Sequence, residues 1–199
     1  MEDELRDAAE QILLSGKSAA TVLHIEPGGA LSGEVGGDST TPLPGDKSLS
    51  HRAALFAAMA EGESFIQNFL VSGVTRAMLD ALTILNVPWR LNGRSLRVCG
   101  IGLKEPSQTL SSSEPLVLDC GNSATTLRLL AGALAAWNIP AVLDGSPGLR
   151  RRPMQRVVEP LQQMGVIIQA TDGHAPLLIQ PSKHPLRALD YELPVASAQ

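Results

Sequence analysis

Two stretches of this chain combine glycine with short polar and basic side chains. The first is Pro44–Arg52, with the sequence PGDKSLSHR, and the second is Cys120–Arg128, with the sequence CGNSATTLR. A run of small apolar residues follows each stretch, which predicts that a helix begins in the turn. A glycine turn that leads into a helix points backbone N–H groups at one place, and that place favours anions. The expected chemistry is therefore recognition of an anionic ligand.

The first stretch is not a nucleotide-binding P-loop, although it shares glycine, lysine and serine with that motif. A P-loop places lysine directly after a glycine, whereas here Asp46 separates Gly45 from Lys47. The alternative without a ligand is a strand-to-helix turn in which Asp46 or Ser48 caps the helix. The second stretch has the same alternative, a helix start capped by serine or threonine.

A third basic feature is the loop Asp144–Met154, with the sequence DGSPGLRRRPM. Pro153 suits the first turn of a helix, where cations are electrostatically unfavourable. Three consecutive arginines at such a place indicate an anionic ligand. The alternative is a solvated basic loop.

Composition excludes several classes of function. The chain has 199 residues, 44% of them hydrophobic, which is enough for a good core. Its net charge of −4 and its 3% aromatic content argue against nucleic-acid binding. No apolar run approaches the ~20 residues of a membrane span, and the acidic start Met1–Glu4 is unlike a secretory signal. We expect a cytoplasmic protein with no nucleic-acid or membrane partner.

Cysteine and histidine show no metal-binding pattern. Cys99 and Cys120 form no CxxC, and the four histidines are scattered. We therefore expect no metal or cofactor, and both thiols buried as small apolar residues. His51 lies inside the first motif, but a single histidine there is more often structural than catalytic.

An internal repeat of about 75 residues determines the expected architecture. Each copy has the glycine turn and its helix, a strand, a second helix, and two strands around a glycine-containing turn. The second helices, about 76–85 and 154–164, are followed by Asn86 and Gly165, where left-handed C-caps are expected. The predicted unit is β-α-β-α-β-β. A third copy begins at Pro194–Gln199, so we expect the chain to be part of something larger.

These motifs, in this order and spacing across residues 23–199, resemble 5-enolpyruvylshikimate-3-phosphate (EPSP) synthase. The resemblance is carried by four segments, Pro44–Arg52, Asp119–Gly132, Arg152–Met154 and Pro194–Gln199. It implies an α/β (α+β) fold, an inside-out αβ barrel domain built from β-α-β-α-β-β repeats and incomplete here, with the active site in a cleft between two domains.

The family's domain organisation then implies three parts. Residues 1–20 are an N-terminal extension. Residues 21–44 form a strand and linker that belong to the other domain, which is absent. Residues 45–199 form the first domain, with two full repeats and the start of a third.

The resemblance implies transfer of the enolpyruvyl group of phosphoenolpyruvate to the 5-hydroxyl of shikimate 3-phosphate, with release of phosphate, in aromatic amino-acid biosynthesis. Both small-molecule substrates carry phosphate and carboxylate groups, which suit lysine, arginine and helix N-termini. The residues matched to shikimate 3-phosphate binding are Lys47, Ser48, Arg52, Ser197 and Gln199. Those matched to phosphoenolpyruvate binding are Lys47, Asn122, Ala124, Arg152 and Gln199. Lys47 is the expected catalytic residue.

Three positions depart from the family pattern. Ala124 stands where most members have glycine, so its methyl group is expected to enter the phosphoenolpyruvate pocket and to reduce inhibition by glyphosate. Ala198 replaces a serine of the phosphate-binding turn, at a cost of roughly 1 kcal/mol. Gly73 and Val74 replace acidic residues at a helix start, which predicts a weak cap.

By the resemblance, we expect the chain to lack counterparts of the family's second domain except its first strand, and so to lack its acidic proton-transfer residue. The first hypothesis is an N-terminal enzyme part that is inactive alone and active with a complementary C-terminal fragment. The alternative is a non-catalytic fragment or binding module with residual affinity for shikimate 3-phosphate. A repeat domain without a ligand is the third.

Overall fold

The computed structural model describes residues 45–103 and 114–192, which all fall in the second of the chain's two units, residues 41–199. The expected N-terminal extension, residues 1–20, and the strand and linker of residues 21–44 lie outside the described residues. So do Ser197, Ala198 and Gln199 in the expected third turn.

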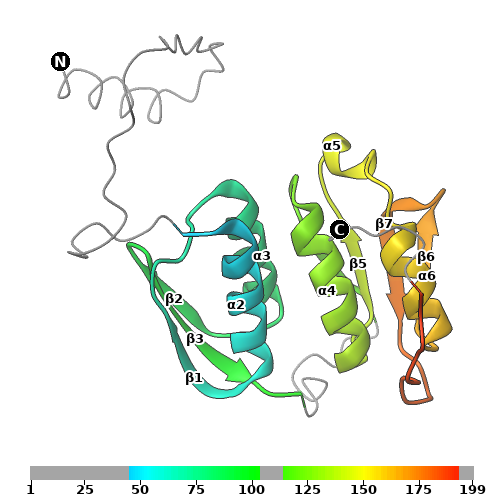
Figure 1. Ribbon diagram of the computed structural model, residues 1–199, viewed down its shortest axis with the longest axis horizontal. Coiled ribbons are helices and arrows are strands. Elements are labelled where there is room, and N and C mark those ends of the chain that lie inside the picture. The colour runs from blue at the N-terminus through cyan, green and yellow to red at the C-terminus, as the bar shows by residue number, and fades with distance from the viewer. Residues whose placement is uncertain (1–44, 104–113, 193–199) are drawn as a thin grey trace, which may run out of the picture. The chain divides into compact units, whose positions relative to one another are not determined.

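The first repeat is a three-stranded antiparallel sheet with two helices on one face (Figure 1). Its elements are α2 (Lys47–Met59), β1 (Glu61–Ile66), α3 (Gly73–Ile84), β2 (Trp89–Asn92) and β3 (Ser95–Ile101). The strand order is β1-β3-β2. Alternation along β3 buries Leu96 and Val98 and leaves Cys99 exposed, so the expectation that both thiols are buried is wrong for Cys99.

The second repeat is a four-stranded sheet in the order β4-β5-β7-β6, with α4 and α6 against it (Figure 1). Its elements are β4 (Leu116–Asp119), α4 (Ala124–Trp137), β5 (Ala141–Asp144), α5 (Pro147–Arg150), α6 (Gln155–Gln163), β6 (Ile167–Thr171) and β7 (His174–Gln180). Strands β4 and β5 are parallel, and the other neighbours are antiparallel. The turns that follow β4 and β5 therefore lie at the same edge of the sheet.

The predicted α/β fold is confirmed, and the second repeat has the whole β-α-β-α-β-β order. The first repeat follows the same order from α2 onward. The expected left-handed residues are also confirmed, with φ of 55° at Asn86 and 93° at Gly165. None of the described helices is long and apolar enough to span a bilayer.

Two helix starts differ from expectation. The cap of α3 is not weak, because Ser72 and Thr75 form a capping box in which Thr75 Oγ1 accepts the Ser72 N–H at 3.0 Å. Helix α6 has Met154 as its N-cap and begins at Gln155, so Pro153 precedes the helix and is not in its first turn.

One buried hydrophobic cluster runs through both repeats. Helices α2 and α4 contribute alanines with no exposed surface, such as Ala54, Ala58 and Ala131. Small side chains at these positions let neighbouring elements approach closely. Trp137 at the end of α4 is 3% exposed, and its indole N–H donates to the Gly102 carbonyl just after β3 at 2.9 Å. This bond joins the second repeat to the first.

Replacing Trp137 tests how much this junction contributes to stability. We expect Trp137→Phe to lower the free energy of unfolding by about 2–3 kcal/mol, through lost packing volume and an unpaired buried carbonyl. Trp89→Phe is the matched control. Its indole also donates a hydrogen bond, to Thr83 Oγ1 at 2.9 Å, but at an exposed place, so we expect a loss below about 1 kcal/mol. Urea unfolding followed by circular dichroism measures both, and equal losses would contradict the assignment.

Candidate functional site

Helices α2 and α4 begin at the two glycine turns, and each begins with a side-chain cap. Asp46 Oδ1 accepts the Leu49 N–H at 2.7 Å at the start of α2. Ser123 Oγ accepts the Thr126 N–H at 3.1 Å at the start of α4. These bonds satisfy part of the orphan N–H groups that every helix start carries. The capping interpretation and the ligand interpretation of these turns are therefore compatible.

A buried polar cluster joins the starts of α2, α3 and α4. The ring of His51 has no exposed surface. Its Nδ1 lies 2.7 Å from the Lys47 carbonyl oxygen, and its Nε2 lies 3.0 Å from the Val74 carbonyl oxygen and 3.3 Å from Ser123 Oγ. Thr126 Oγ1 lies 3.2 Å from the same Val74 oxygen and 2.8 Å from Ser123 Oγ. We call His51, Ser123, Thr126 and the Val74 carbonyl the His51 cluster.

The turn before α2 brings together three of the predicted binding residues. Lys47 and Arg52 are exposed. Arg52 Nη1 donates to the Ser48 carbonyl at 3.3 Å and also contacts Ser48 Oγ. Gly45 lets this turn lie against the chain after β1, because a Cβ there would be 2.3 Å from the Asn68 carbonyl oxygen. Arg52 and Ser48 are therefore in contact, and the exposed Lys47 precedes Ser48 at the start of α2.

The turn before α4 is held by the loop that follows β5. The Ser146 N–H donates to the Gly121 carbonyl at 2.8 Å, and Ser146 Oγ donates to Asn122 Oδ1 at 3.2 Å. Gly145 is required for this contact, since a Cβ there would lie 2.3 Å from the Gly121 oxygen. Asn122 is thus fixed against the loop that leads to the three arginines.

The three arginines do not act alike, which corrects the expectation that all three await an anion. Arg150 makes a two-pronged ion pair with Asp144, with Nε to Oδ1 at 2.8 Å. Hydrogen bonding from Arg150 lowers the pKa of Asp144, and Asp144 in turn raises the pKa of Arg150. Arg151 and Arg152 are exposed and make no ion pair within residues 45–103 and 114–192.

Arg128 belongs to the same surface, although it was not among the predicted site residues. Its Nη2 donates to the Pro153 carbonyl at 2.9 Å, while its Nε is buried without a partner among the described residues. Burial lowers the pKa of Arg128, and the charges of Arg152 and Arg156 lower it further. The sequence could have indicated Arg128 as a site residue, because Arg128 matches Arg52 in the internal repeat.

The described parts of the predicted site therefore lie on two joined turns. Lys47, Ser48 and Arg52 lie at the start of α2, and Asn122 and Ala124 lie at the start of α4. Arg128 of α4 donates to the carbonyl of Pro153, the residue that follows Arg152. Ala124 is only 4% exposed and belongs to the core, so the expectation that its methyl group enters a ligand pocket is wrong.

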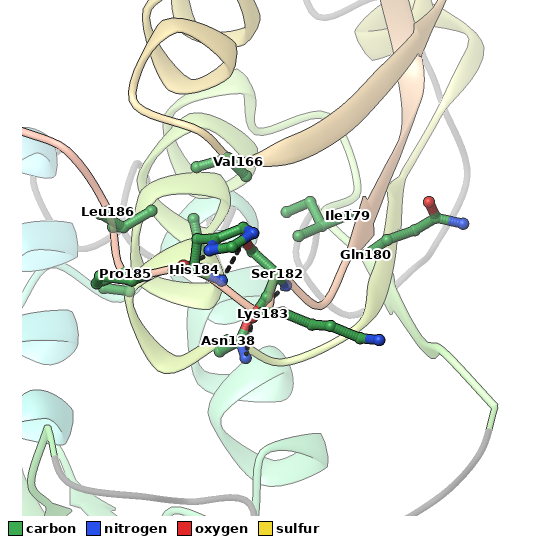
Figure 2. A pocket seen from close by; sticks show the side chains of 11 residues that line it. Asn138, Val166, Ile179, Gln180, Ser182, Lys183, His184, Pro185 and Leu186 are labelled. Atoms are coloured by element: carbon green, nitrogen blue, oxygen red, sulfur yellow. Dashed lines mark hydrogen bonds between the residues drawn. The ribbon is translucent and has the colours of Figure 1, made fainter.

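A well-formed small cavity lies elsewhere. Figure 2 shows it at the C-terminal end of α4, where its volume is about 240 Å³. Asn138 Oδ1 accepts the Ser182 N–H at 2.7 Å, and Asn138 Nδ2 donates to the Ser182 carbonyl at 3.1 Å. Helix α4 has 14 residues, so this cavity lies about 20 Å from the turn at Asn122. The cavity is a structural feature separate from the candidate site.

Comparison with known proteins gives one consistent family. The family model described as EPSP synthase (3-phosphoshikimate 1-carboxyvinyltransferase) matches residues 25–199. The 3-phosphoshikimate 1-carboxyvinyltransferase of Salinibacter ruber is 43% identical over 164 residues, covering 80% of this chain and 36% of its own length. That of Acidithiobacillus ferrooxidans is 42% identical over 177 residues, covering 88% and 38%.

A solved structure titled EPSP synthase from Acinetobacter baumannii superposes with a TM-score of 0.69 at 36% identity. The match covers 78% of this chain and 35% of that one. The chain thus spans less than two fifths of the length of these relatives.

Cys120 immediately precedes the second glycine turn, and it gives this region a measurable pH dependence. Burial, with smaller contributions from Asp119 and Asp144, raises the pKa of Cys120 from 9.0 to about 12. Below pH 9 the thiol is protonated in the folded and the unfolded chain. Between pH 9 and 12 only the unfolded chain releases the proton, so the free energy of unfolding falls as pH rises.

We therefore expect the parent chain to lose stability faster than Cys120→Ala between about pH 9 and pH 12, by up to ~1.4 kcal/mol per pH unit. Cys99→Ala, at an exposed thiol, is the control and should follow the parent. Urea unfolding at each pH measures the difference. Parallel curves for the parent and Cys120→Ala would show that the thiol is not buried in solution.

Proposed function

The chain belongs to the EPSP synthase family, and from this premise we propose that it supplies the first-domain substrate turns of a 3-phosphoshikimate 1-carboxyvinyltransferase. The reaction transfers the enolpyruvyl group of phosphoenolpyruvate to the 5-hydroxyl of shikimate 3-phosphate and releases phosphate. The observation that carries the proposal is the joining of the starts of α2 and α4 through His51 and Ser123. The start of α2 bears the exposed cations Lys47 and Arg52, and the loop before α6 carries the exposed Arg152.

The turn at α2 binds shikimate 3-phosphate in this proposal. Lys47 is the first residue of α2 and is exposed, so its ammonium group reaches ligands of both turns and is the catalytic group. Arg52 is oriented by its contacts with Ser48. Its other N–H groups remain available for a carboxylate, the planar anion that a guanidinium binds best.

The turn at α4 binds phosphoenolpyruvate. The N–H groups at the start of α4 and the charge of Arg152 converge on a phosphate, and Asn122 is held at this turn by Ser146. The depressed pKa of Arg128 supports an anion here, because a phosphate beside Arg128 and Arg152 replaces repulsion by attraction. By the family match, Ser197 completes the shikimate 3-phosphate site and Gln199 completes both sites.

The proposal requires further residues for turnover. The curated relatives are more than twice as long as the region matched here, and the exposed site groups Lys47, Arg52 and Arg152 are all cations without a proton-transferring acid. We propose that the chain is active only with a complementary C-terminal portion. Alone it would be a non-catalytic binding module with weak affinity for shikimate 3-phosphate. The cytoplasmic location stays a prediction.

Arg152 and its neighbour Arg151 offer a matched test of the phosphoenolpyruvate site. The full chain is combined with the C-terminal portion of a relative, and phosphate release is measured with both substrates. We expect Arg152→Ala to raise the KM for phosphoenolpyruvate by about 10–100-fold, the value of one charge-assisted contact. Arg151→Ala removes an equal charge one residue away and should change KM less than about threefold.

Measurements on the unmodified chain test the proposed function as a whole. Phosphate release by the combination, absent from either part alone, is the expected result. No release, together with no binding of shikimate 3-phosphate in calorimetry, would refute the function. Equal effects of Arg151→Ala and Arg152→Ala would refute the residue assignment alone.

Ala124 gives a prediction about inhibition. We propose that the completed enzyme is less sensitive to glyphosate than its Ala124→Gly variant, because the buried methyl group packs in the core and stiffens the start of α4, where the longer inhibitor must fit. Dose–response curves of phosphate release measure this. Ala133→Gly, at a buried position in the middle of α4, controls for the helix cost of about 1 kcal/mol. Equal inhibition of the parent and Ala124→Gly would contradict the prediction.

A further inference from the structure

Among the described residues of the two glycine turns, His51 is the one basic side chain that is wholly buried. It has no exposed surface and so does not touch a substrate directly. Its ring nevertheless lies between Lys47, at the start of α2, and Ser123, the cap of α4. Those two residues flank the places where the proposed function puts shikimate 3-phosphate and phosphoenolpyruvate.

We propose that His51 is a positioning residue that fixes the two substrate-binding turns relative to each other. The inference rests on the proposed function for the identity of the ligands. The hydrogen-bond geometry by which the ring joins the turns is independent of those ligands.

The ring is anchored to its own helix on one side. The Lys47 carbonyl can only accept a hydrogen bond, so Nδ1, at 2.7 Å, carries a proton. This bond fixes the orientation of the ring and aims Nε2 away from α2. The anchor carbonyl belongs to the residue that carries the proposed catalytic ammonium group.

The other side of the ring reaches two further helix starts. If the ring is neutral, Nε2 accepts a hydrogen bond from Ser123 Oγ, and if it is charged, Nε2 donates to the Val74 carbonyl. Thr126 Oγ1 serves the partner left over, since it lies within bonding distance of both oxygens. Thr126 Oγ1 can also donate to the Val74 carbonyl, whose second lone pair is available in either form. The neutral ring therefore ties α2 directly to α4, and the charged ring ties α2 to α4 through the shared Val74 carbonyl of α3.

Weaker contacts of His51 would change the geometry in which the two turns bind the substrates. Ser123 stands between Asn122 and Ala124, so any shift of α4 against α2 moves the phosphate-binding turn relative to Lys47. A displacement of about 1 Å between reacting groups can cost on the order of 100-fold in rate. An apolar side chain in place of His51 would preserve volume but remove the hydrogen bonds that join the Lys47 carbonyl to the Val74 carbonyl and Ser123 Oγ.

The substrate experiment uses the full chain combined with the C-terminal portion of a relative. We expect His51→Leu to raise the KM for both substrates about tenfold, the value of one net hydrogen bond, and to lower kcat. His51→Gln can still offer a donor and an acceptor near the position of Nε2, so we expect it to stay within about threefold of the parent.

Thr75→Val is the matched control for lost stability. Thr75 is also fully buried, but its hydroxyl bonds to the Leu70 carbonyl at 2.6 Å and to the α3 cap rather than to α2 or α4. We expect it to lower the melting temperature without changing either KM. Unchanged KM values in His51→Leu, or equal KM increases in Thr75→Val, would overturn the proposal.

Hydrogen exchange separates this proposal from the proposed function, because it needs no substrate. In the full chain, we expect His51→Leu to speed amide exchange at residues 73–76 and 123–127 several-fold under native conditions. An increase confined to α2 would overturn the bridge. A coupled increase in a chain that binds no shikimate 3-phosphate would refute the function while supporting the bridge.

Discussion

Where helices begin beside one another, their first backbone groups must find hydrogen-bond partners out of contact with water. Here Asp46, Ser72 and Ser123 cap the three helix starts, and His51 and Thr126 bond the groups that lie between them. An unpaired buried polar group costs about 1–3 kcal/mol. The packing of the small-residue helices against each other is therefore possible only while this buried network stays complete.

The two turns are copies, but they are not in the same register. Alignment on Gly45 and Gly121 sets Asp46 opposite Asn122, yet the cap of α4 is Ser123, one residue further on. This frees the Asn122 side chain to accept from Ser146 instead of capping the helix. One sequence pattern thereby gives a cap in the first repeat and a polar contact at the turn surface in the second.

The same one-residue offset places the two matched arginines in different surroundings. Counted from the helix starts at Lys47 and Ala124, Arg52 comes one position later in its helix than Arg128 does. One position is about 100° around a helix. Arg52 is accordingly exposed and folds back on Ser48, whereas Arg128 turns toward Pro153 with its Nε buried.

The repeat and the fold class were predictable because they depend on periodicity and on glycine and asparagine at positive φ, both visible in sequence. His51 was not predictable as a bridge, because one partner is the backbone carbonyl of Val74 and the other is 72 residues away. Every residue type carries the same backbone carbonyl, so a hydrogen bond accepted by a carbonyl cannot be predicted from the residue type. The run of three arginines misled for a similar reason, since the partner of Arg150 is Asp144 at the end of a strand.

The ion pair between Arg150 and Asp144 also determines which arginine charges act near the turn at α4. Asp144 occupies Arg150, so the positive potential near α4 comes from Arg152 and Arg128, and burial and mutual repulsion already lower the pKa of Arg128. The loop before α6 and helix α4 therefore hold like charges near one another in a chain whose net charge is −4. Packing and caps must hold such an arrangement in place. Under the proposed function, a phosphate would bind groups that need no reorganisation, which is the condition under which electrostatic interactions stabilise a transition state best.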